Sequence, residues 1–322
     1  MSSNFALIRN PRSRKNVNDP DNFRKEAQDY LGKWFVEPPS RESIIEAVQD
    51  MSRQEVDCIA VDGGDGTVSD VLTAIYHAYD DEALPAVAIL PSGNTNLIAS
   101  DVGFGQRGLS ALKRLEELCE NKTMRYNVRR RHALGVRWSD PARPAVLGMF
   151  HGMAAYTRAI EIAHKPAILD HFSHEMAVAI TLASAFGKLI FRKTRDEWMK
   201  GEKVFMAKNQ ENGQEDYCFL FLSTTLNQLT KSIWPFWNEK EGGIHYLKVK
   251  DHPPHLLAAS AALLTGRSPA WLRKNRHYDS GTAHQITLKM SHDFVLDGEV
   301  MESGADGITH LFSGPLFDFI QA

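Results

Sequence analysis

The chain has 322 residues, of which 43% are hydrophobic and 24% charged, and its formal net charge is −3. This length suits one large domain or two ordinary ones, and the hydrophobic content is enough for a buried core. The nearly neutral charge disfavours a general nucleic-acid binder, which would usually be basic over a whole face.

The first third of the chain alternates short apolar runs with amphipathic helical patterns. The first run, Phe5–Arg9, is closed by the turn pair Asn10-Pro11. Strands are expected at residues 5–9, 58–61 and 86–90, a short apolar patch lies at 34–36, and helices are expected near 21–32, after Ser40 and at 68–75. Strands and helices that alternate in this way predict a parallel sheet covered on both faces.

After residue 126 the pattern changes to a mostly antiparallel β domain. Strands are expected at residues 132–138, 145–150, 203–207, 217–223, 244–249 and 285–290, with helical inserts near 174–191 and 254–265. We therefore expect an α/β domain over residues 1–126 and a β-rich domain over 127–304. The C-terminal segment, 305–322, is treated separately, because it could return to the first domain.

A glycine-rich segment follows the strand expected at residues 58–61 and runs directly into a helix. In order, it contains Asp62, Gly63, Gly64, Asp65, Gly66 and Thr67. Glycines let backbone N–H groups approach a phosphate closely, and a helix N-terminus adds partial positive charge. Thr67 and Asp70 have the spacing of a capping box, which would start the helix here. The segment predicts a phosphate-binding loop.

Asp65 is the informative residue of this loop. A carboxylate repels a polyphosphate unless Mg²⁺ lies between them, or unless the carboxylate takes a proton from the acceptor hydroxyl. The alternative is a tight turn in which Asp65 only caps the backbone. No Walker lysine follows the glycines and GxGxxG is absent, so the P-loop and Rossmann interpretations both fail.

A second polar loop, with Gly93, Asn94, Thr95 and Asn96, follows the strand expected at residues 86–90. It should lie beside the first loop, at the sheet edge where open α/β sheets bind ligands. Its amides and hydroxyls could hold phosphate or ribose oxygens. The alternative is a plain strand-to-helix connection with Asn96 as the helix cap.

Four segments, in this order and spacing, resemble the diacylglycerol kinase family, which is related to sphingosine kinases and NAD kinases. They read NPRS at residues 10–13, GGDGT at 63–67, LPSGNTNLIA at 90–99 and DGE at 297–299. Arg14, Asn94 and Leu97 depart from the family pattern, in which glycine, threonine and aspartate are usual. The resemblance implies a first domain of the NAD kinase type and a second domain that is a β-sandwich.

The resemblance also implies the roles of individual residues. Glu299 would accept the proton of the lipid hydroxyl, while Asp65 would organise Mg²⁺ and the reacting groups. A further metal site of the family would fall at residues 238–244, where an aspartate is expected at Gly242; either Glu241 or Glu239 replaces it, or this second ion is missing here. The residues implied to bind the nucleotide are Asn10, Pro11, Gly63, Gly64, Asp65, Gly66, Thr67, Gly93, Asn94, Thr95 and Asn96. Taken alone, the DGE segment is more typical of a surface turn than of a catalytic site.

The implied function is an ATP- and Mg²⁺-dependent kinase for a membrane lipid hydroxyl, with diacylglycerol as the default acceptor. A sphingoid-base kinase or another lipid kinase is the nearest alternative. Leu97 and Gly242 leave open a nucleotide-binding regulatory protein with little turnover, although Asp65 and Glu299 favour an enzyme. The DGE segment disfavours a soluble-substrate kinase of the NAD kinase type.

Other features bear on location and partners. The three cysteines form no CxxC pair, and the sequence shows no signal-peptide pattern. Its apolar stretches are shorter than the roughly 20 residues that span a bilayer. These features indicate a cytoplasmic protein, or one peripheral at the inner membrane face. Residues 129–131 with Lys122 and Arg125 are either a solvated strand edge or a contact for anionic lipids, and the cations at 188–195 could serve likewise. Residues 234–237 are either core or an interfacial aromatic group. Residues 170–174 hold an aspartate and two histidines, which without a third ligand at fixed spacing favour a structural role over a metal site.

Overall fold

The computed structural model describes residues 5–19, 22–163, 199–209, 211–229, 233–237 and 243–322. This part of the chain divides into two compact units. The first contains residues 1–133, 146–148 and 314–322, and the second contains residues 134–145 and 149–313. Strands β5 (Val128–Trp138) and β15 (Ile308–Ile320) contribute residues to both units.

The first unit is built on a parallel sheet in the strand order β15-β4-β3-β1-β2. Its strands are β1 (Phe5–Arg9), β2 (Phe35–Val36), β3 (Cys58–Gly63), β4 (Ala86–Pro91) and the end of β15. Every residue of β1 and β3 is buried, as expected for parallel strands that are covered on both faces. The predicted parallel α/β sheet is therefore confirmed.

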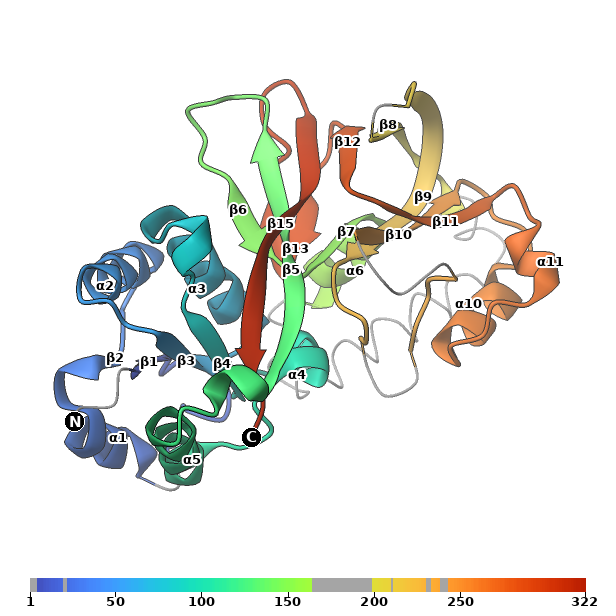
Figure 1. Ribbon diagram of the computed structural model, residues 1–322. Coiled ribbons are helices and arrows are strands. Elements are labelled where there is room, and N and C mark those ends of the chain that lie inside the picture. Colours follow the sequence, from blue (N-terminus) through green and yellow to red (C-terminus); the bar gives the residue numbers. More distant parts are fainter. Residues whose placement is uncertain (1–4, 20–21, 164–198, 210, 230–232, 238–242) are drawn as a thin grey trace. The chain divides into compact units, whose positions relative to one another are not determined.

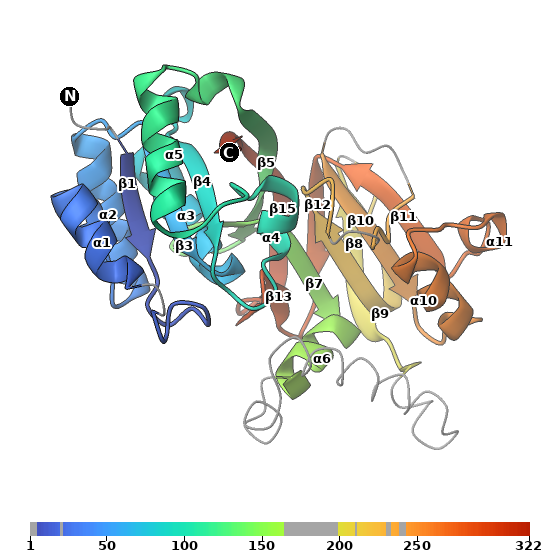
Figure 2. The ribbon, with the colours of Figure 1, turned by 90° about the horizontal axis from the view of Figure 1, so that it is seen from below.

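Two layers of helices cover this sheet. Figures 1 and 2 show α1 (Phe23–Leu31) and α5 (Gly108–Glu120) on one face, and α2 (Arg41–Arg53) and α3 (Asp65–Ala78) on the other. The first layer packs on Phe5, Leu7 and neighbouring buried side chains. Helix α2 begins where the sequence predicts, because the Ser40 hydroxyl accepts the backbone N–H of Ser43 as an N-cap.

The second unit is an antiparallel sheet, as predicted. Its strand order is β14-β13-β7-β9-β8-β12-β15, with β10 beside β9 and β11 beside β10. The strands not yet given are β7 (Phe150–Ala154), β8 (Glu202–Lys208), β9 (Gln214–Thr224), β10 (Ile244–Lys250), β11 (Tyr278–Ala283), β12 (Gln285–Lys289), β13 (Phe294–Leu296) and β14 (Glu299–Met301). Its core includes Phe221, Leu247, Ile286 and Phe294, each almost wholly buried.

The remaining elements are short. The strand β6 (Val146–Gly148) pairs with β5, α4 (Leu97–Val102) follows β4, and α6 (Ala155–Ala163) follows β7. Helices α10 (Leu256–Leu264) and α11 (Ala270–Arg273) lie between β10 and β11. The helix expected at residues 174–191 lies outside the described residues. Among the helices that the structure describes, none is long and apolar enough to cross a membrane.

Candidate functional site

The glycine loop joins β3 to α3 without a side-chain cap. Helix α3 begins at Asp65 with Gly64 as N-cap, and its first backbone bond runs from the Val68 N–H to the Gly64 carbonyl at 3.1 Å. The predicted capping box is therefore wrong: Thr67 lies inside the first turn, and Asp70 forms an ion pair with Arg41. Because an α-helix leaves its first N–H groups without intrahelical acceptors, the amides at this end can receive an anion.

The two predicted loops lie in backbone contact. Gly63 pairs with Pro91, and the Ser92 N–H donates to the Gly63 carbonyl at 2.9 Å. A Cβ atom added to Gly93 would lie 2.5 Å from the Gly64 Cα, closer than non-bonded carbons normally approach, whereas one added to Gly64 would lie 3.1 Å from the Gly93 Cα. Gly93 therefore requires glycine, and the approach places the amides of the two loops side by side.

Asp65 joins the two loops through its carboxylate. Its oxygens accept the N–H groups of Leu97, at 2.9 Å, and Ile98, at 3.0 Å, which are the first residues of α4. Burial raises the pKa of Asp65, while these two hydrogen bonds act in the opposite direction. Leu97 lacks the carboxylate usual at its position, yet its backbone N–H holds Asp65. Each carboxylate oxygen keeps a further lone pair for a ligand.

The second loop is closed by Asn96 and touched by Arg14. Asn96 has a φ of 49°, and its side chain both accepts the Gly93 N–H and donates to the Gly93 carbonyl, each at 2.9 Å. Thr95 is exposed at the loop tip. The Arg14 Nη1 lies 3.4 Å from the Asn94 Oδ1, so two residues that depart from the family pattern are in contact.

Asn10 connects the loop after β1 to the glycine loop. Its side-chain amide donates to the Thr67 hydroxyl at 2.8 Å, and its oxygen accepts the Arg12 N–H at 2.9 Å. The Asn16 amide donates to the Asn10 carbonyl at 3.0 Å. These bonds hold the loop against the start of α3.

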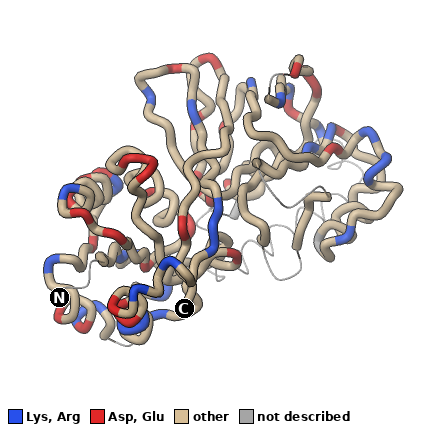
Figure 3. The backbone as a smooth tube through the Cα atoms, viewed as in Figure 1, with Lys and Arg blue, Asp and Glu red and all other residues tan. Residues whose placement is uncertain are grey.

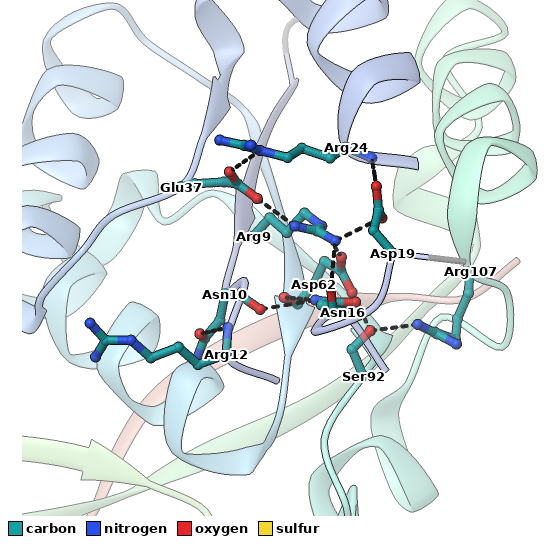
Figure 4. Close-up of polar contacts among 10 residues, drawn as sticks. All are labelled: Arg9, Asn10, Arg12, Asn16, Asp19, Arg24, Glu37, Asp62, Ser92 and Arg107. Atoms are coloured by element: carbon teal, nitrogen blue, oxygen red, sulfur yellow. Dashed lines mark hydrogen bonds and ion pairs between the residues drawn. The ribbon is translucent and has the colours of Figure 1, made fainter. Parts of the chain in front are cut away.

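A buried ionic network lies beneath these loops (Figure 4). Arg9 is only 1% exposed and forms ion pairs with Glu37, with Asp19 at 2.8 Å and with Asp62 at 3.3 Å. The Ser92 hydroxyl donates to Asp62 and accepts the guanidinium of Arg107 at 3.0 Å. Burial raises the pKa of Asp62, against the effect of its hydrogen bonds and of Arg9. The network thus connects residues beneath the loop after β1, the glycine loop and the Gly93 loop.

The sequence predictions missed the residues that contact Asp62 in this network. One signal was available, since Arg9 is a charged residue at the end of an otherwise apolar run that must be buried. Its partners Asp19 and Glu37 could not be identified, because the contacts depend on how the loops fold back over β1.

A cavity of about 400 Å³ opens beside the loop after β1 and the first turns of α2 and α3. Asn10, Pro11 and Thr67, which the sequence assigns to nucleotide binding, line one side of it. Its complete lining is Ile8, Arg9, Asn10, Pro11, Arg12, Arg24, Glu37, Pro38, Pro39, Ser40, Arg41, Ile44, Thr67 and Asp70. It lies at the carboxyl ends of parallel strands, where ligands bind in open α/β sheets.

The DGE segment of the second unit is a hairpin turn with a buried anchor. Asp297 and Gly298, at φ 47° and 89°, connect β13 to β14 as a two-residue loop, for which Asp-Gly is a preferred pair. The Asp297 carboxylate accepts the N–H groups of Met149 at 2.8 Å and Phe150 at 2.9 Å. Glu299 follows with an exposed side chain. The turn is thus pinned to the sheet, and it holds Glu299 at the surface of the second unit.

The structure also bears on the other sequence features. Arg130 pairs with Asp318 and Arg131 with Asp101, while Arg129 donates to the Asp101 carbonyl, which favours the structural interpretation of that patch. Trp234 and Phe236 pack on His245, as core residues would.

Several predicted features lie outside the described residues. They are Glu239, Glu241 and Gly242 of the second metal site, residues 170–174, and the cations at 188–195. In the part of the chain that the structure describes, no cluster of three or more potential metal-binding side chains occurs.

Comparisons with known proteins agree with this geometry. Residues 4–130 match the model of the diacylglycerol kinase catalytic domain. Two solved structures of Bacillus anthracis proteins that carry the name diacylglycerol kinase are similar to the chain. Each is 15% identical, and their TM-scores are 0.67 and 0.61. The alignments cover 99% of this chain and 97% and 96% of those chains. None of the curated proteins compared with the chain matches it.

The match of residues 4–130 includes the loop after β1, the glycine loop and the Gly93 loop, and therefore the whole of the arrangement described for the first unit. Residues 4–130 are thus similar to the diacylglycerol kinase catalytic domain, and the chain as a whole shares the fold of the Bacillus anthracis structures.

Proposed function

We propose that this protein is an ATP- and Mg²⁺-dependent lipid kinase that transfers the γ-phosphoryl group to the hydroxyl of diacylglycerol. The observation that carries the proposal is the backbone contact between the Gly64 and Gly93 loops beside the free amides of α3. It lies within the segment that matches the catalytic domain family.

The first unit would hold the nucleotide. Phosphoryl transfer depends mainly on positioning and on neutralising charge, so amides directed at phosphate oxygens are the machinery that it needs. Asn10 and Pro11 would cover the nucleotide, with Thr67 oriented by the Asn10 amide. The cavity beside these residues gives room for a further part of the ligand.

Asp65 fits a role with Mg²⁺. Mg²⁺ commonly binds one or two carboxylates together with phosphate oxygens and waters, so a single half-buried carboxylate beside the phosphate loops is a suitable ligand. The ion would neutralise charge that develops on the transferred group. The Leu97 and Ile98 amides would keep the Asp65 oxygens oriented as the nucleotide binds.

Glu299 would accept the proton of the lipid hydroxyl. An exposed carboxylate on a pinned hairpin can meet an acceptor from outside the protein while its backbone stays in place. Because the acceptor resides in a bilayer and ATP is cytoplasmic, the enzyme would work at the inner membrane face.

Arg14 would contribute a cation that the family pattern lacks. Its guanidinium reaches Asn94 across the two loops, where nucleotide phosphates would lie. Arginine can bind phosphate with two parallel hydrogen bonds. In this chain it would supply positive charge that a lysine supplies in P-loop enzymes. Arg14→Gly should therefore raise the KM for ATP and leave the KM for the lipid unchanged.

The proposal is tested by incubating the protein with labelled ATP and one acceptor, which is diacylglycerol, sphingosine or NAD. The two lipids are supplied in mixed micelles. Wild type should label diacylglycerol, and Glu299→Gln should reduce kcat by a factor of about 10² to 10⁴, the usual range for a general base. Glu302→Gln is the matched control, since Glu302 is exposed one residue beyond β14. Asp65→Asn should lose Mg²⁺-dependent turnover.

The outcomes separate the candidate functions. Labelling of sphingosine or NAD in place of diacylglycerol would show that the protein is a kinase with a different acceptor from the one proposed. ATP binding by folded wild type without transfer to any acceptor would contradict the enzyme and favour a regulatory role. Equal activity of the Glu299→Gln and Glu302→Gln variants would remove Glu299 from the chemistry.

A further inference from the structure

An uncharged helix with an exposed apolar side stands out on the second unit. Helix α10 has the sequence LLAASAALL, and its residues Leu257, Ala258 and Ala261 are exposed. Leu257 is 49% exposed, and Trp271 of the neighbouring helix α11 is 42% exposed. Most large apolar side chains of the chain are buried, so two exposed ones on adjacent short helices call for an explanation.

Both helices are held firmly on their inner sides. Ala259 of α10 and Leu272 of α11 are 1% and 0% exposed. The Tyr278 hydroxyl donates to the Pro254 carbonyl at 2.8 Å, just before α10 begins. The rings of His255 and Trp271 meet edge-on, with their centroids 6.0 Å apart. The apolar residues therefore belong to an ordered surface, which we call the α10–α11 surface (residues 252–277).

The charge of the α10–α11 surface has one sign. Residues 252–277 contain Arg267, Arg273, Lys274 and Arg276 but no aspartate or glutamate, although the whole chain has a net charge of −3. All four cations are exposed. Among the ion pairs of the described residues, none involves them. Figure 3 shows the same segment with basic positions and without acidic ones.

We propose that the α10–α11 surface docks on a bilayer that contains anionic phospholipids. Apolar side chains next to a tryptophan suit the boundary between headgroups and acyl chains, and unpaired cations suit a negative surface. A protein partner would fit this surface less well, because small alanines offer few features for a specific contact. The inference rests on the proposed lipid kinase function, whose acceptor lies in a bilayer, but docking itself needs no turnover.

Vesicle sedimentation tests the proposal on the full chain, with vesicles of phosphatidylcholine alone or mixed with phosphatidylglycerol. Wild type should bind the mixed vesicles more tightly, and added salt should weaken that binding by screening. A single basic residue near an anionic surface strengthens binding about fivefold. The triple variant Arg273→Gln, Lys274→Gln, Arg276→Gln should therefore bind on the order of 100-fold more weakly.

Matched controls remove the same charge and the same apolar area elsewhere. Lys113→Gln, Lys122→Gln, Arg125→Gln removes three exposed cations of the first unit. Leu257→Gln should weaken vesicle binding, whereas Leu316→Gln, at a position 46% exposed, should not. Kinase activity on micelle-dispersed lipid should stay the same in all four variants.

The results distinguish this proposal from the proposed function. Equal loss of vesicle binding in both charge variants would overturn the α10–α11 surface as the docking site. A wild type that does not bind anionic vesicles, or a concentration-dependent dimer that Leu257→Gln abolishes, would overturn it also. Vesicle binding that the α10–α11 variants reduce, with no lipid kinase activity in any protein, would support the docking surface and contradict the kinase.

Discussion

The substitution Gly93→Ala tests whether the contact between the two glycine loops forms the nucleotide site. The added Cβ would lie 2.5 Å from the Gly64 Cα. Carbon atoms in contact normally lie about 3.5–4.0 Å apart, so the loops would have to separate by about 1 Å. Both atoms belong to tightly connected segments, since Ser92 is bonded to Gly63 and Asp65 to Leu97. No flexible side chain can take up the strain.

We expect this strain to lower the free energy of unfolding by about 1–3 kcal/mol, as overpacking usually does. A displacement of about 1 Å in a phosphate site should reduce kcat/KM for ATP about 100-fold. Urea denaturation, ATP titration calorimetry and the kinase assay measure the three quantities.

Gly32→Ala is the control for instability alone. Gly32 has a φ of +55° and no atom within 4 Å of an added Cβ, so alanine should cost about 1–3 kcal/mol through its backbone conformation alone. The two variants should lose similar stability, but only Gly93→Ala should lose ATP affinity. If Gly93→Ala retains wild-type affinity and kcat/KM, the two-loop contact is not the phosphate site.

Three further predictions concern the buried polar groups. Arg9→Met should lower the free energy of unfolding by about 3–5 kcal/mol in urea denaturation, because it leaves buried acids without their cation; a stable variant would contradict the network. Asp297→Asn presents an N–H group to two backbone donors, so unfolding should become about 1–3 kcal/mol easier and kcat should fall while the KM for ATP is kept. Burial lowers the pKa of His151 from 6.5 to about 3. The unfolded histidine takes up a proton below pH 6.5 and the buried one does not. As the pH is lowered from 6.5 to about 3, the free energy of unfolding should therefore decrease by about 1.4 kcal/mol per pH unit. His151→Gln should remove that part of the slope, and an unchanged slope would assign it to other groups.

Local pattern was sufficient for the elements of the first unit. The apolar runs at β1, β3 and β4 are short and bounded by turn residues, and Ser40 marks the start of α2. These signals lie within a few residues of one another, so they can be recognised in the sequence without knowledge of the tertiary structure. The capping box failed because Gly64 and the partners of Asp65 start α3 three residues earlier, through contacts distant in sequence.

Strands β11, β13, β14 and β15 of the described chain were absent from the predicted set, β7 was predicted only at its first residue, and β2 only as an apolar patch. Strands β13 and β14 are each three residues long, and β11 and β15 are interrupted by Gly281 and by Gly314-Pro315. Glycine and proline weaken the alternating pattern that identifies a strand. Their neighbours in the sheet supply the missing stabilisation, which a single sequence does not reveal.

The sequence by itself determined which residues we propose to hold a phosphate: glycines after two buried strands, an acid among them, and polar side chains beside them. The tertiary structure decided how they meet. It brought Gly64 against Gly93, placed the carboxylate of Asp65 on the amides of α4, and buried Arg9 among acids under the loops. The physical reason is that chemistry belongs to single side chains, whereas close approach and burial arise only when distant segments pack together.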